Sequence, residues 1–313
     1  MSERTIETLA TDVDKSHKGS HRPSFWYRMR PSEIGDECSR YLWLSFRWAS
    51  LPKAPPGRIA RIFSRGNREE ENIIDDVQKT GITVMVRDPC TGKQYAVVAA
   101  RGHMYGLVDG VAFDGSMKYL RRREWAILEA KSHNEKNFRA LNKHGLKKTA
   151  PKHWAQLQLY MHMLQAKLAL YAARNKNDET DLFIEVDYDA DGAQMHLERV
   201  ERIAFSPAAP ERISSDPDYY KCSFCNHRDT CLGDTLPLRN CRTCRFSAPI
   251  DDGKWLCQRR QEEVDRVTQM RGCELHRWIP TILNAERTNN VSEDIGRYKM
   301  RTDGRNLEDA GPE

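Results

Sequence analysis

The spacing of apolar residues predicts helices early in the chain and again near its middle. Over residues 58–78 the apolar positions recur every three or four residues, which is the period of one helix face. A second long helix is expected over residues 152–173, directly after Pro151, and a turn followed by a shorter helix over residues 31–48.

Short segments with β-like alternation, separated by turn residues, lie between these helices and after them. Strands are expected at residues 82–87, 95–100, 103–109, 110–114 and 124–131, with two more near 181–188 and 194–204. This order of helices, strands, a long helix and further strands predicts an α/β (α+β) fold, in which helices flank a mixed central sheet.

Changes in composition divide the expected chain into four parts. Residues 1–20 contain little that could form a core, so we expect them to be disordered. Residues 21–235 are expected to form the main domain and residues 236–283 a small cysteine-rich module. The polar residues 284–313 are expected to form a flexible tail.

Overall composition adds the cellular setting. Hydrophobic residues make up 39% and charged residues 30% of the 313 residues, as in a globular protein. No apolar run approaches the roughly 20 residues of a membrane span, and no secretory signal begins the chain. We therefore expect a cytoplasmic protein.

The net charge of +5 is mildly basic, and the clusters Arg121–Arg123 and Lys143–Lys148 suit either phosphate contacts or solvated loops.

Three charged residues stand near the ends of expected strands. Glu129 and Lys131 are two positions apart on the strand that ends at residue 131, so they project from the same face. Asp109 ends a segment twenty residues earlier. Because Mg²⁺ prefers carboxylate oxygens and water, Asp109 and Glu129, with the backbone carbonyl of Ala130, are candidate ligands for Mg²⁺ or Mn²⁺. Such a cation would serve phosphodiester hydrolysis, in which Lys131 would orient the attacking water or stabilise the transition-state oxygens.

The two long helices supply further candidates. Glu70 falls on the apolar stripe of the first helix, where a carboxylate is costly unless it is paired or binds a cation, so it is expected to complete the metal site. Gln156 and Tyr160 are four residues apart and share a face of the second helix. They are expected to hold Lys131 or a DNA phosphate in place; the alternative is that both are ordinary surface residues.

The order of these motifs resembles the RecB-like branch of the PD-(D/E)XK nucleases across about residues 31–231. The matching motifs are Gly66…Glu70, Gly106-x-x-Asp109, Glu129-x-Lys131 and Gln156-x-x-x-Tyr160. The resemblance implies a central mixed sheet flanked by helices, dependence on Mg²⁺ or Mn²⁺, and cleavage of DNA. Many RecB-like members carry His where this chain has Glu70, whereas some phage-type exonucleases use Glu in that neighbourhood. The size and layout of the chain suit a phage-encoded protein of this kind.

Nine cysteines occur, grouped largely in close pairs, and in a reducing compartment such pairs bind metal more often than they form disulfides. The triple Cys222-x2-Cys225-x5-Cys231 needs a fourth ligand, for which His227 would indicate zinc and Cys38 is the distant candidate. With Cys38 the pattern resembles the iron–sulfur nucleases, which include the CRISPR-associated RecB-like exonucleases and the nuclease domain of the AddB helicase subunit. The resemblance implies a [4Fe–4S] cluster that joins the two ends of the nuclease domain.

A second set of cysteines follows the first. Cys241, Cys244, Cys257 and Cys273 have spacings typical of a structural zinc site, with His276 as a substitute ligand. A segment this short buries too little surface to fold alone, so a metal would stabilise it. The alternative is that some of these thiols are free and buried.

The leading functional hypothesis is a metal-dependent exonuclease that acts on single-stranded DNA or DNA ends in recombination or repair. The sequence has no G-x-x-x-x-G-K-[ST] motif, so any unwinding would come from a helicase or recombinase partner. Two alternatives remain. One is a structure-specific endonuclease that uses the same metal site, and the other is a non-catalytic DNA-binding adaptor on the same fold.

Overall fold

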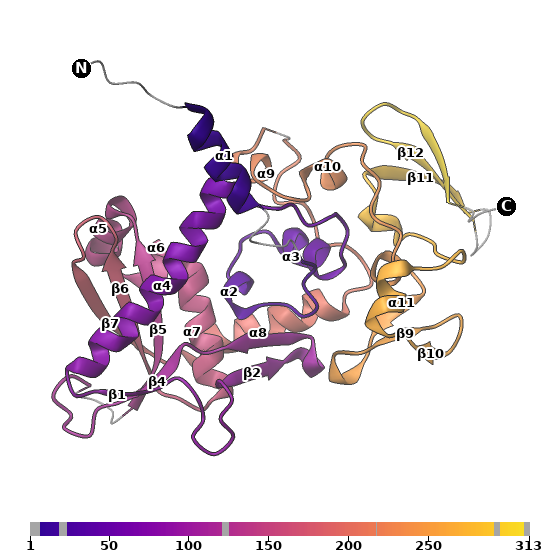
Figure 1. Ribbon diagram of the computed structural model, residues 1–313. Helices are drawn as coiled ribbons and strands as arrows, with labels where there is room; N and C mark the ends of the chain where they lie inside the picture. Colours follow the sequence, from indigo (N-terminus) through magenta and orange to yellow (C-terminus); the bar gives the residue numbers. More distant parts are fainter. Residues whose placement is uncertain (1–6, 19–23, 121–124, 217, 291–294, 310–313) are drawn as a thin grey trace, which may run out of the picture. The chain divides into compact units, whose positions relative to one another are not determined.

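The computed structural model describes residues 7–18, 24–120, 125–216, 218–290 and 295–309. The chain forms two compact units, and each unit is assembled from separate segments (Figure 1). Unit 1 contains Met1–Ser24, Pro52–Val97 and Leu107–Ala190, and unit 2 contains Phe25–Leu51, Val98–Gly106 and Asp191–Glu313. The units therefore differ from the consecutive domains that composition predicted.

Unit 1 is built around a five-stranded sheet. Its strands lie in the order β1 (Thr83–Met85), β4 (Gly110–Phe113), β5 (Trp125–His133), β6 (Leu168–Asn175) and β7 (Asp181–Asp187). β5 and β6 are parallel, and the other neighbours are antiparallel. The expected mixed central sheet is confirmed.

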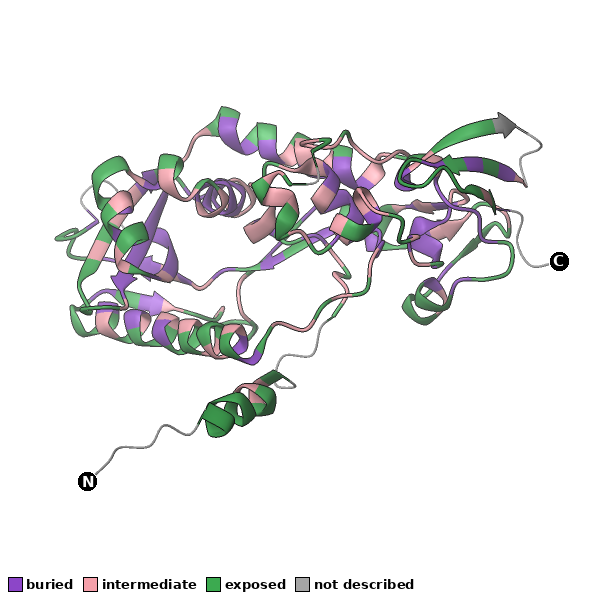
Figure 2. Cartoon of the chain, turned by 90° about the horizontal axis from the view of Figure 1, so that it is seen from above, coloured by how far each residue is buried: buried purple, intermediate pink, exposed green. Residues whose placement is uncertain are grey.

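Helices cover both faces of this sheet, as expected. They are α4 (Gly57–Lys79) on one face, and α5 (Glu135–His144), α6 (Leu146–Thr149) and α7 (Pro151–Met163) on the other. Successive residues of β5 point to opposite faces: Leu128 packs in a cluster with Ile73 of α4, whereas Ile127 packs with Leu157 of α7. Figure 2 shows that the strands of this sheet are largely buried, whereas the helices around it mix buried, intermediate and exposed residues.

Two expected elements in the second half of the chain were wrong. The helix predicted over residues 152–173 ends at Met163, and Leu168–Asn175 forms β6 instead. All residues of β6 are buried, and a strand buried on both faces lacks the alternation that identifies a strand. The strand predicted at residues 194–204 belongs to helix α8 (Ala190–Phe205). Its buried residues Ala193, His196 and Val200 follow helical spacing.

Unit 2 combines short helices with two small antiparallel sheets. The helices are α2 (Pro31–Ile34), α3 (Ser39–Phe46), α9 (Tyr220–Ser223), α10 (Arg228–Cys231) and α11 (Arg266–Arg271), together with most of α8. Its sheets are β8 (Ser247–Pro249), β9 (Trp255–Cys257) and β10 (Glu262–Glu263), and β11 (Ala285–Asn290), β12 (Gly296–Met300) and β13 (Asn306–Asp309). A separate pair, β2 (Ala96–Ala99) with β3 (Met104–Leu107), spans the boundary in sequence between the two units.

A buried arginine organises the interior of unit 2. The guanidinium of Arg242 lies 3.8 Å from the ring centroid of Trp48 and donates hydrogen bonds to the carbonyls of Phe46 (3.0 Å) and Tyr27 (3.1 Å). Its Nε donates to Gln269 Oε1 at 2.9 Å. These contacts compensate the burial of a cationic side chain.

Both ends of the chain carry regular structure where disorder was expected. Residues 7–18 form helix α1 (Glu7–Lys18), whose Asp14 pairs with Arg61 of α4 at 2.7 Å. The expected flexible tail contains β11 to β13, because alternate residues of β12, including Tyr298, are buried. Asp309 is also buried and accepts a hydrogen bond from Trp278 N at 2.7 Å. The cluster Arg121–Arg123 lies outside the described residues.

No helix in the described ranges is both long enough and apolar enough to cross a bilayer.

Candidate metal and catalytic site

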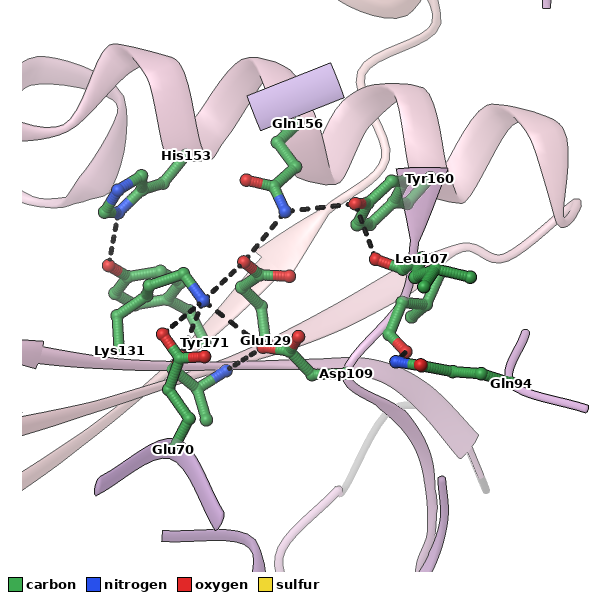
Figure 3. Close-up of polar contacts among 12 residues, drawn as sticks. Glu70, Gln94, Leu107, Asp109, Glu129, Lys131, His153, Gln156, Tyr160 and Tyr171 are labelled. Atoms are coloured by element: carbon green, nitrogen blue, oxygen red, sulfur yellow. Dashed lines mark hydrogen bonds and ion pairs between the residues drawn. The ribbon is translucent and has the colours of Figure 1, made fainter. Parts of the chain in front are cut away.

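Four charged side chains of unit 1 meet at one place, which we call the acidic centre: Glu70, Asp109, Glu129 and Lys131 (Figure 3). Glu70 comes from α4, and Glu129 and Lys131 come from the same face of β5. Asp109 directly precedes β4, whose Gly110 pairs with Leu128 of β5. The antiparallel register therefore brings Asp109 beside Glu129, so three separate elements supply this site.

The ammonium of Lys131 lies among the three carboxylates. Lys131 Nζ is 2.9 Å from Glu129 Oε1, 3.0 Å from Glu70 Oε1 and 3.3 Å from Asp109 Oδ2. It also donates a hydrogen bond to the backbone oxygen of Ala130 at 2.8 Å, and Asp109 Oδ2 accepts one from Ala130 N at 3.0 Å. The structure thus brings together all five residues that the sequence predicted for metal binding and for the catalytic lysine.

The ionisation of these groups is strongly coupled. Burial, with smaller contributions from the charges of Asp109 and Glu70, raises the pKa of Glu129 to about 7 against the opposing effect of Lys131. Burial also raises the pKa of Glu70. Burial acts to lower the pKa of Lys131, but the three carboxylates together raise it well above its ordinary value. The acidic centre therefore favours a protonated lysine and holds negative charge in excess of it.

Gln156 and Tyr160 are buried, so the alternative of two surface residues is wrong. Gln156 Nε2 donates to Glu129 Oε1 at 2.8 Å and to the hydroxyl of Tyr160 at 3.1 Å. The Tyr160 hydroxyl in turn donates to the carbonyl of Leu107 at 2.8 Å. In this structure the pair holds Glu129 rather than Lys131, and it links α7 to the segment that leads to Asp109.

The donors of the acidic centre suit a hard divalent cation. With all three carboxylates ionised, one ammonium leaves two negative charges uncompensated, and carboxylate and carbonyl oxygens are the ligands that Mg²⁺ prefers. The second carboxylate oxygen of Glu129, Oε2, is buried and has no hydrogen-bond partner among the described residues. In this conformation no three His, Cys, Asp or Glu side chains of the described ranges are arranged around a possible metal position. At the acidic centre Lys131 Nζ lies among the oxygens that a cation would share, so cation and ammonium would compete.

A polar cluster beside the acidic centre was not predicted. The hydroxyl of Tyr171 lies 2.8 Å from His133 Nε2 and 2.6 Å from His153 Nδ1. Burial, followed by nearby positive charges that include Lys131, lowers the pKa of each histidine to about 4. His133 follows Lys131 by two residues on β5, a strand-spacing signal that could have identified it. Tyr171 gave no such signal, because its strand was predicted as helix.

Glu69, which precedes Glu70 on α4, is also buried. Its carboxylate lies 3.2 Å from Arg174 Nη1 on β6. Arg174 also bonds Asp76 of α4 at 2.7 Å and Asp181 of β7 at 2.7 Å. These ion pairs fix α4 against the sheet next to Glu70.

The first cysteine set lies within unit 2, and its thiols are free. Burial, then the neighbouring thiols of Cys38, Cys231 and Cys222, raise the pKa of Cys225 to about 11. Cys38 Sγ accepts a hydrogen bond from the backbone of the α3 helix at 3.3 Å. The ring nitrogens of His227 lie 2.9 Å and 3.0 Å from serine hydroxyls, which argues against this histidine as the fourth ligand.

The second cysteine set also lies in unit 2 with free thiols. Burial, then the thiols of Cys244, Cys273 and Cys257, raise the pKa of Cys241 to about 12. The four thiols are therefore close enough to influence one another's ionisation. No three His, Cys, Asp or Glu side chains of the described residues, however, are arranged to hold a metal ion in this conformation. His276 Nε2 lies 3.0 Å from Thr243 Oγ1.

No protein-family model and no curated protein matches this sequence. Among solved structures, the chain is similar to an alkaline exonuclease from Laribacter hongkongensis, LHK-Exo, with 11% identity and a TM-score of 0.40, over 62% of this chain and 90% of that one. A structure of LHK-Exo in complex with dAMP gives 12% identity and a TM-score of 0.39, over 57% and 86%. Similarity at this level leaves function to be argued from the residues of this chain.

Proposed function

We propose that this chain is a metal-dependent DNA nuclease of the PD-(D/E)XK type that hydrolyses phosphodiester bonds at DNA ends. One observation carries the proposal: Lys131 of β5 shares its ammonium with Glu129 of the same strand, with Asp109 just before β4, and with Glu70 of helix α4. Arg174 also meets three carboxylates, so their number alone does not distinguish a metal site from a structural ion-pair network. At Lys131 the backbone oxygen of Ala130 joins the carboxylates, and Glu129 Oε2 is buried with no hydrogen-bond partner among the described residues. This set of oxygens suits a hard cation.

The residues would divide the work as follows. Glu70, Asp109, Glu129 and the Ala130 carbonyl would hold Mg²⁺ or Mn²⁺, which lowers the pKa of bound water and neutralises charge on the phosphate. Lys131 would then orient the attacking water or donate to the non-bridging phosphate oxygens. Gln156 keeps Glu129 in position through its 2.8 Å hydrogen bond.

A nuclease assay on end-labelled DNA tests this proposal directly. We expect linear DNA to be degraded with Mn²⁺ or Mg²⁺ and not with EDTA, while covalently closed circular DNA survives. Cleavage of circles would favour the structure-specific endonuclease. No cleavage of any DNA by the metal-loaded protein, together with DNA binding unchanged in Asp109→Ala, would favour the non-catalytic adaptor.

The lysine and the carboxylates are expected to differ in metal binding. Lys131→Ala should abolish cleavage but keep or tighten Mn²⁺ binding, because it removes the ammonium that competes for the carboxylates. Glu129→Ala should lose both cleavage and most Mn²⁺ affinity. Calorimetric titration with Mn²⁺ distinguishes the two variants, and equal loss of metal binding in both would contradict the assigned roles.

We further propose that Cys38, Cys222, Cys225 and Cys231 bind a [4Fe–4S] cluster and that Cys241, Cys244, Cys257 and Cys273 bind zinc. The support is that each set lies within unit 2 and that its thiols influence one another's pKa. Metal analysis of anaerobically purified protein tests both sites. Cys38→Ser should lose iron and keep zinc, whereas Cys241→Ser should lose zinc and keep iron; protein with zinc and no iron would contradict the cluster.

The proposed setting is recombination or repair, in which a helicase or recombinase would expose the DNA end. Because the sequence has no G-x-x-x-x-G-K-[ST] motif, any unwinding would come from that partner.

A further inference from the structure

The second cysteine set borders an open depression in unit 2. The depression has a volume of about 980 Å³, and residues 271–275 line it together with Arg239 and Arg260. All of these residues belong to unit 2, and Cys273 is the member of the cysteine set that reaches the depression. We call it the arginine cleft, because Arg239, Arg260 and Arg271 supply its positive charge.

The three arginines come from separate parts of the chain. Arg239 precedes the short turn that begins at Cys241, Arg260 lies between β9 and β10, and Arg271 is the last residue of α11. The glycine after α11, Gly272, has a φ of +67°, and a Cβ there would lie 2.9 Å from the carbonyl oxygen of Arg239. Glycine at this position therefore permits the close approach that brings the end of α11 to Arg239.

Two of the three guanidinium groups are available to a ligand. Arg271 is exposed and forms no ion pair with a described residue. Arg260 lies 3.5 Å from Glu262, and both side chains are about half exposed. An ion pair exposed in this way contributes little in water, so Arg260 can exchange Glu262 for another anion at small cost.

Arg239 is instead fixed in place by the fold. Its guanidinium lies 3.1 Å from the buried carboxylate of Asp309 and 4.0 Å from the ring centroid of Trp278. Even so, 43% of its side chain is exposed. A guanidinium that is already ordered loses less conformational entropy when a ligand binds.

The lining suits a phosphate-bearing strand. Three arginines outnumber the one lining carboxylate, Glu274, and Leu275 adds an apolar surface that is 45% exposed. The planar fork of arginine pairs with two phosphate oxygens at once. The cleft is open, and its volume is at the upper end of the roughly 300–1,000 Å³ of small-ligand pockets, so it has room for more than one phosphate.

We propose that the arginine cleft binds the phosphate backbone of a DNA strand, with Leu275 against a sugar or base. The proposal deepens the proposed function and rests on it for the choice of DNA among polyanions. It assigns a DNA contact to unit 2, whereas the acidic centre belongs to unit 1. DNA binding itself can be measured without any cleavage.

The test is a binding titration of the full chain with a fluorescent single strand of about 20 nucleotides, without added divalent cations, at several salt concentrations. Arg260→Gln/Arg271→Gln should bind roughly 10- to 30-fold more weakly at about 0.1 M salt. Its log–log salt slope should fall by about 1.4, since each phosphate contact on a single strand contributes about 0.7. Arg260→Lys/Arg271→Lys should recover the slope but not the full affinity, because lysine restores the charge without the fork. Unchanged affinity in the glutamine variant would overturn the proposal.

A charge-matched control separates the cleft from net charge. Lys299 and Arg301 line a different depression of unit 2, where Arg301 pairs with Glu286 at 2.9 Å. Lys299→Gln/Arg301→Gln removes the same number of positive charges and should bind within about twofold of the wild type. An equal loss of affinity in this control would contradict a specific role of the cleft.

Zinc content and a second variant test whether the arginines only support the cysteine set. Burial raises the pKa of Cys241, and the charge of Arg260 opposes this effect. Leu275→Asp keeps the arginines but adds a negative charge to the cleft, so it should weaken DNA binding at least about fivefold while zinc content stays unchanged. If the glutamine variant lost both zinc and DNA affinity while Leu275→Asp bound normally, the arginines would be structural and the proposal would fail.

Two further outcomes separate the cleft from other interpretations. Displacement of the DNA by an equal concentration of polyglutamate would overturn the proposal by making an acidic peptide the ligand. If the arginine variants lose DNA binding as predicted while the wild type cleaves nothing with Mn²⁺, the proposed function fails and the binding site stands. If the wild type cleaves DNA and the variants bind it normally, the binding site fails and the proposed function stands.

Discussion

Gln156 connects the buried carboxylate of Glu129 to the body of α7. It donates to Glu129 at 2.8 Å while Tyr160, itself anchored to Leu107, accepts its other hydrogen bond. A carboxylate that must bind a cation at a fixed place benefits from a neighbour that fixes its rotamer. Gln156 is therefore a positioning residue in the proposed reaction.

Gln156→Met should lower kcat roughly 10- to 100-fold, because one hydrogen bond to a charged group contributes about 1.5–3 kcal/mol. Gln158→Met is the matched control. Gln158 is equally buried on α7 but bonds Asp187 and Asp189, away from the acidic centre. Gln158→Met should lower the free energy of unfolding but change kcat by less than about twofold. Steady-state cleavage of labelled DNA measures both variants, and equal losses would show that Gln156 acts only through the fold.

The residues of the acidic centre could be predicted from sequence because they follow local rules. Strand alternation places Glu129 and Lys131 on one face, and helical spacing assigns Glu70 to a core-facing stripe. The cluster of His133, Tyr171 and His153 escaped prediction because it depends on the pairing of β5 with β6, which no local pattern encodes. The pairing of Glu69 with Arg174 could not be predicted for the same reason, because the two residues lie on different elements.

At the scale of elements, Arg174 joins α4 to two strands. From β6 it contacts Glu69 and Asp76 of α4 and Asp181 of β7. Arg174→Ala leaves Glu69 buried without its partner and should destabilise the protein by about 3–5 kcal/mol, as expected for a broken buried ion pair.

Urea unfolding tests this prediction against a surface ion pair. Arg139 pairs with Glu135 on α5 and is 80% exposed, so Arg139→Ala should change the free energy of unfolding by less than about 0.5 kcal/mol. Similar small effects in both variants would show that Arg174 does not hold α4 in place.

α4 and β4 were predictable because one face of each meets solvent. β5 and β6 are both buried on two faces; β5 was still predicted as a strand, but β6 was predicted as helix. α8 was predicted as a strand because a short segment of apolar residues can fit both the helical repeat of 3.6 residues and the two-residue alternation of a strand. The strands near the C-terminus were missed because β12 buries only alternate residues of a largely polar segment.

For the whole molecule, buried histidines should make stability depend on pH. Burial lowers the pKa of His103, His133 and His153 to about 4 and that of His276 to about 3. Between about pH 6.5 and 4 the unfolded chain therefore binds more protons at these residues, so their contribution to stability is lost as pH falls. Glu70, Glu129 and Asp309 act in the opposite sense because burial raises their pKa values, but these are three groups against four histidines, and only the pKa of Glu129 is raised as far as about 7.

Thermal unfolding at pH 7.5 and pH 5 should show a lower Tm at the acidic pH. His103→Gln is expected to reduce the difference, because the side-chain Nε2 of glutamine can still donate toward the carbonyl of Ile250, 2.7 Å from His103 Nε2, without titrating. The depressed pKa of His103 corresponds to roughly 3 kcal/mol at most. An unchanged difference in Tm would contradict the role of His103.

The parallel pairing of β5 with β6 also governs when the acidic centre can form during synthesis. Two parallel neighbours cannot be joined by a tight turn, and here α5, α6 and α7 lie between them. Chains are synthesised at about 5–20 residues per second. Glu129 therefore leaves the ribosome well before Gln156 and before β6, the parallel neighbour of its strand. The nascent chain therefore carries its carboxylates for seconds before they are gathered. In the proposed nuclease, a centre that is complete only once this crossover has closed would leave the unfinished chain inactive toward nucleic acid near the ribosome.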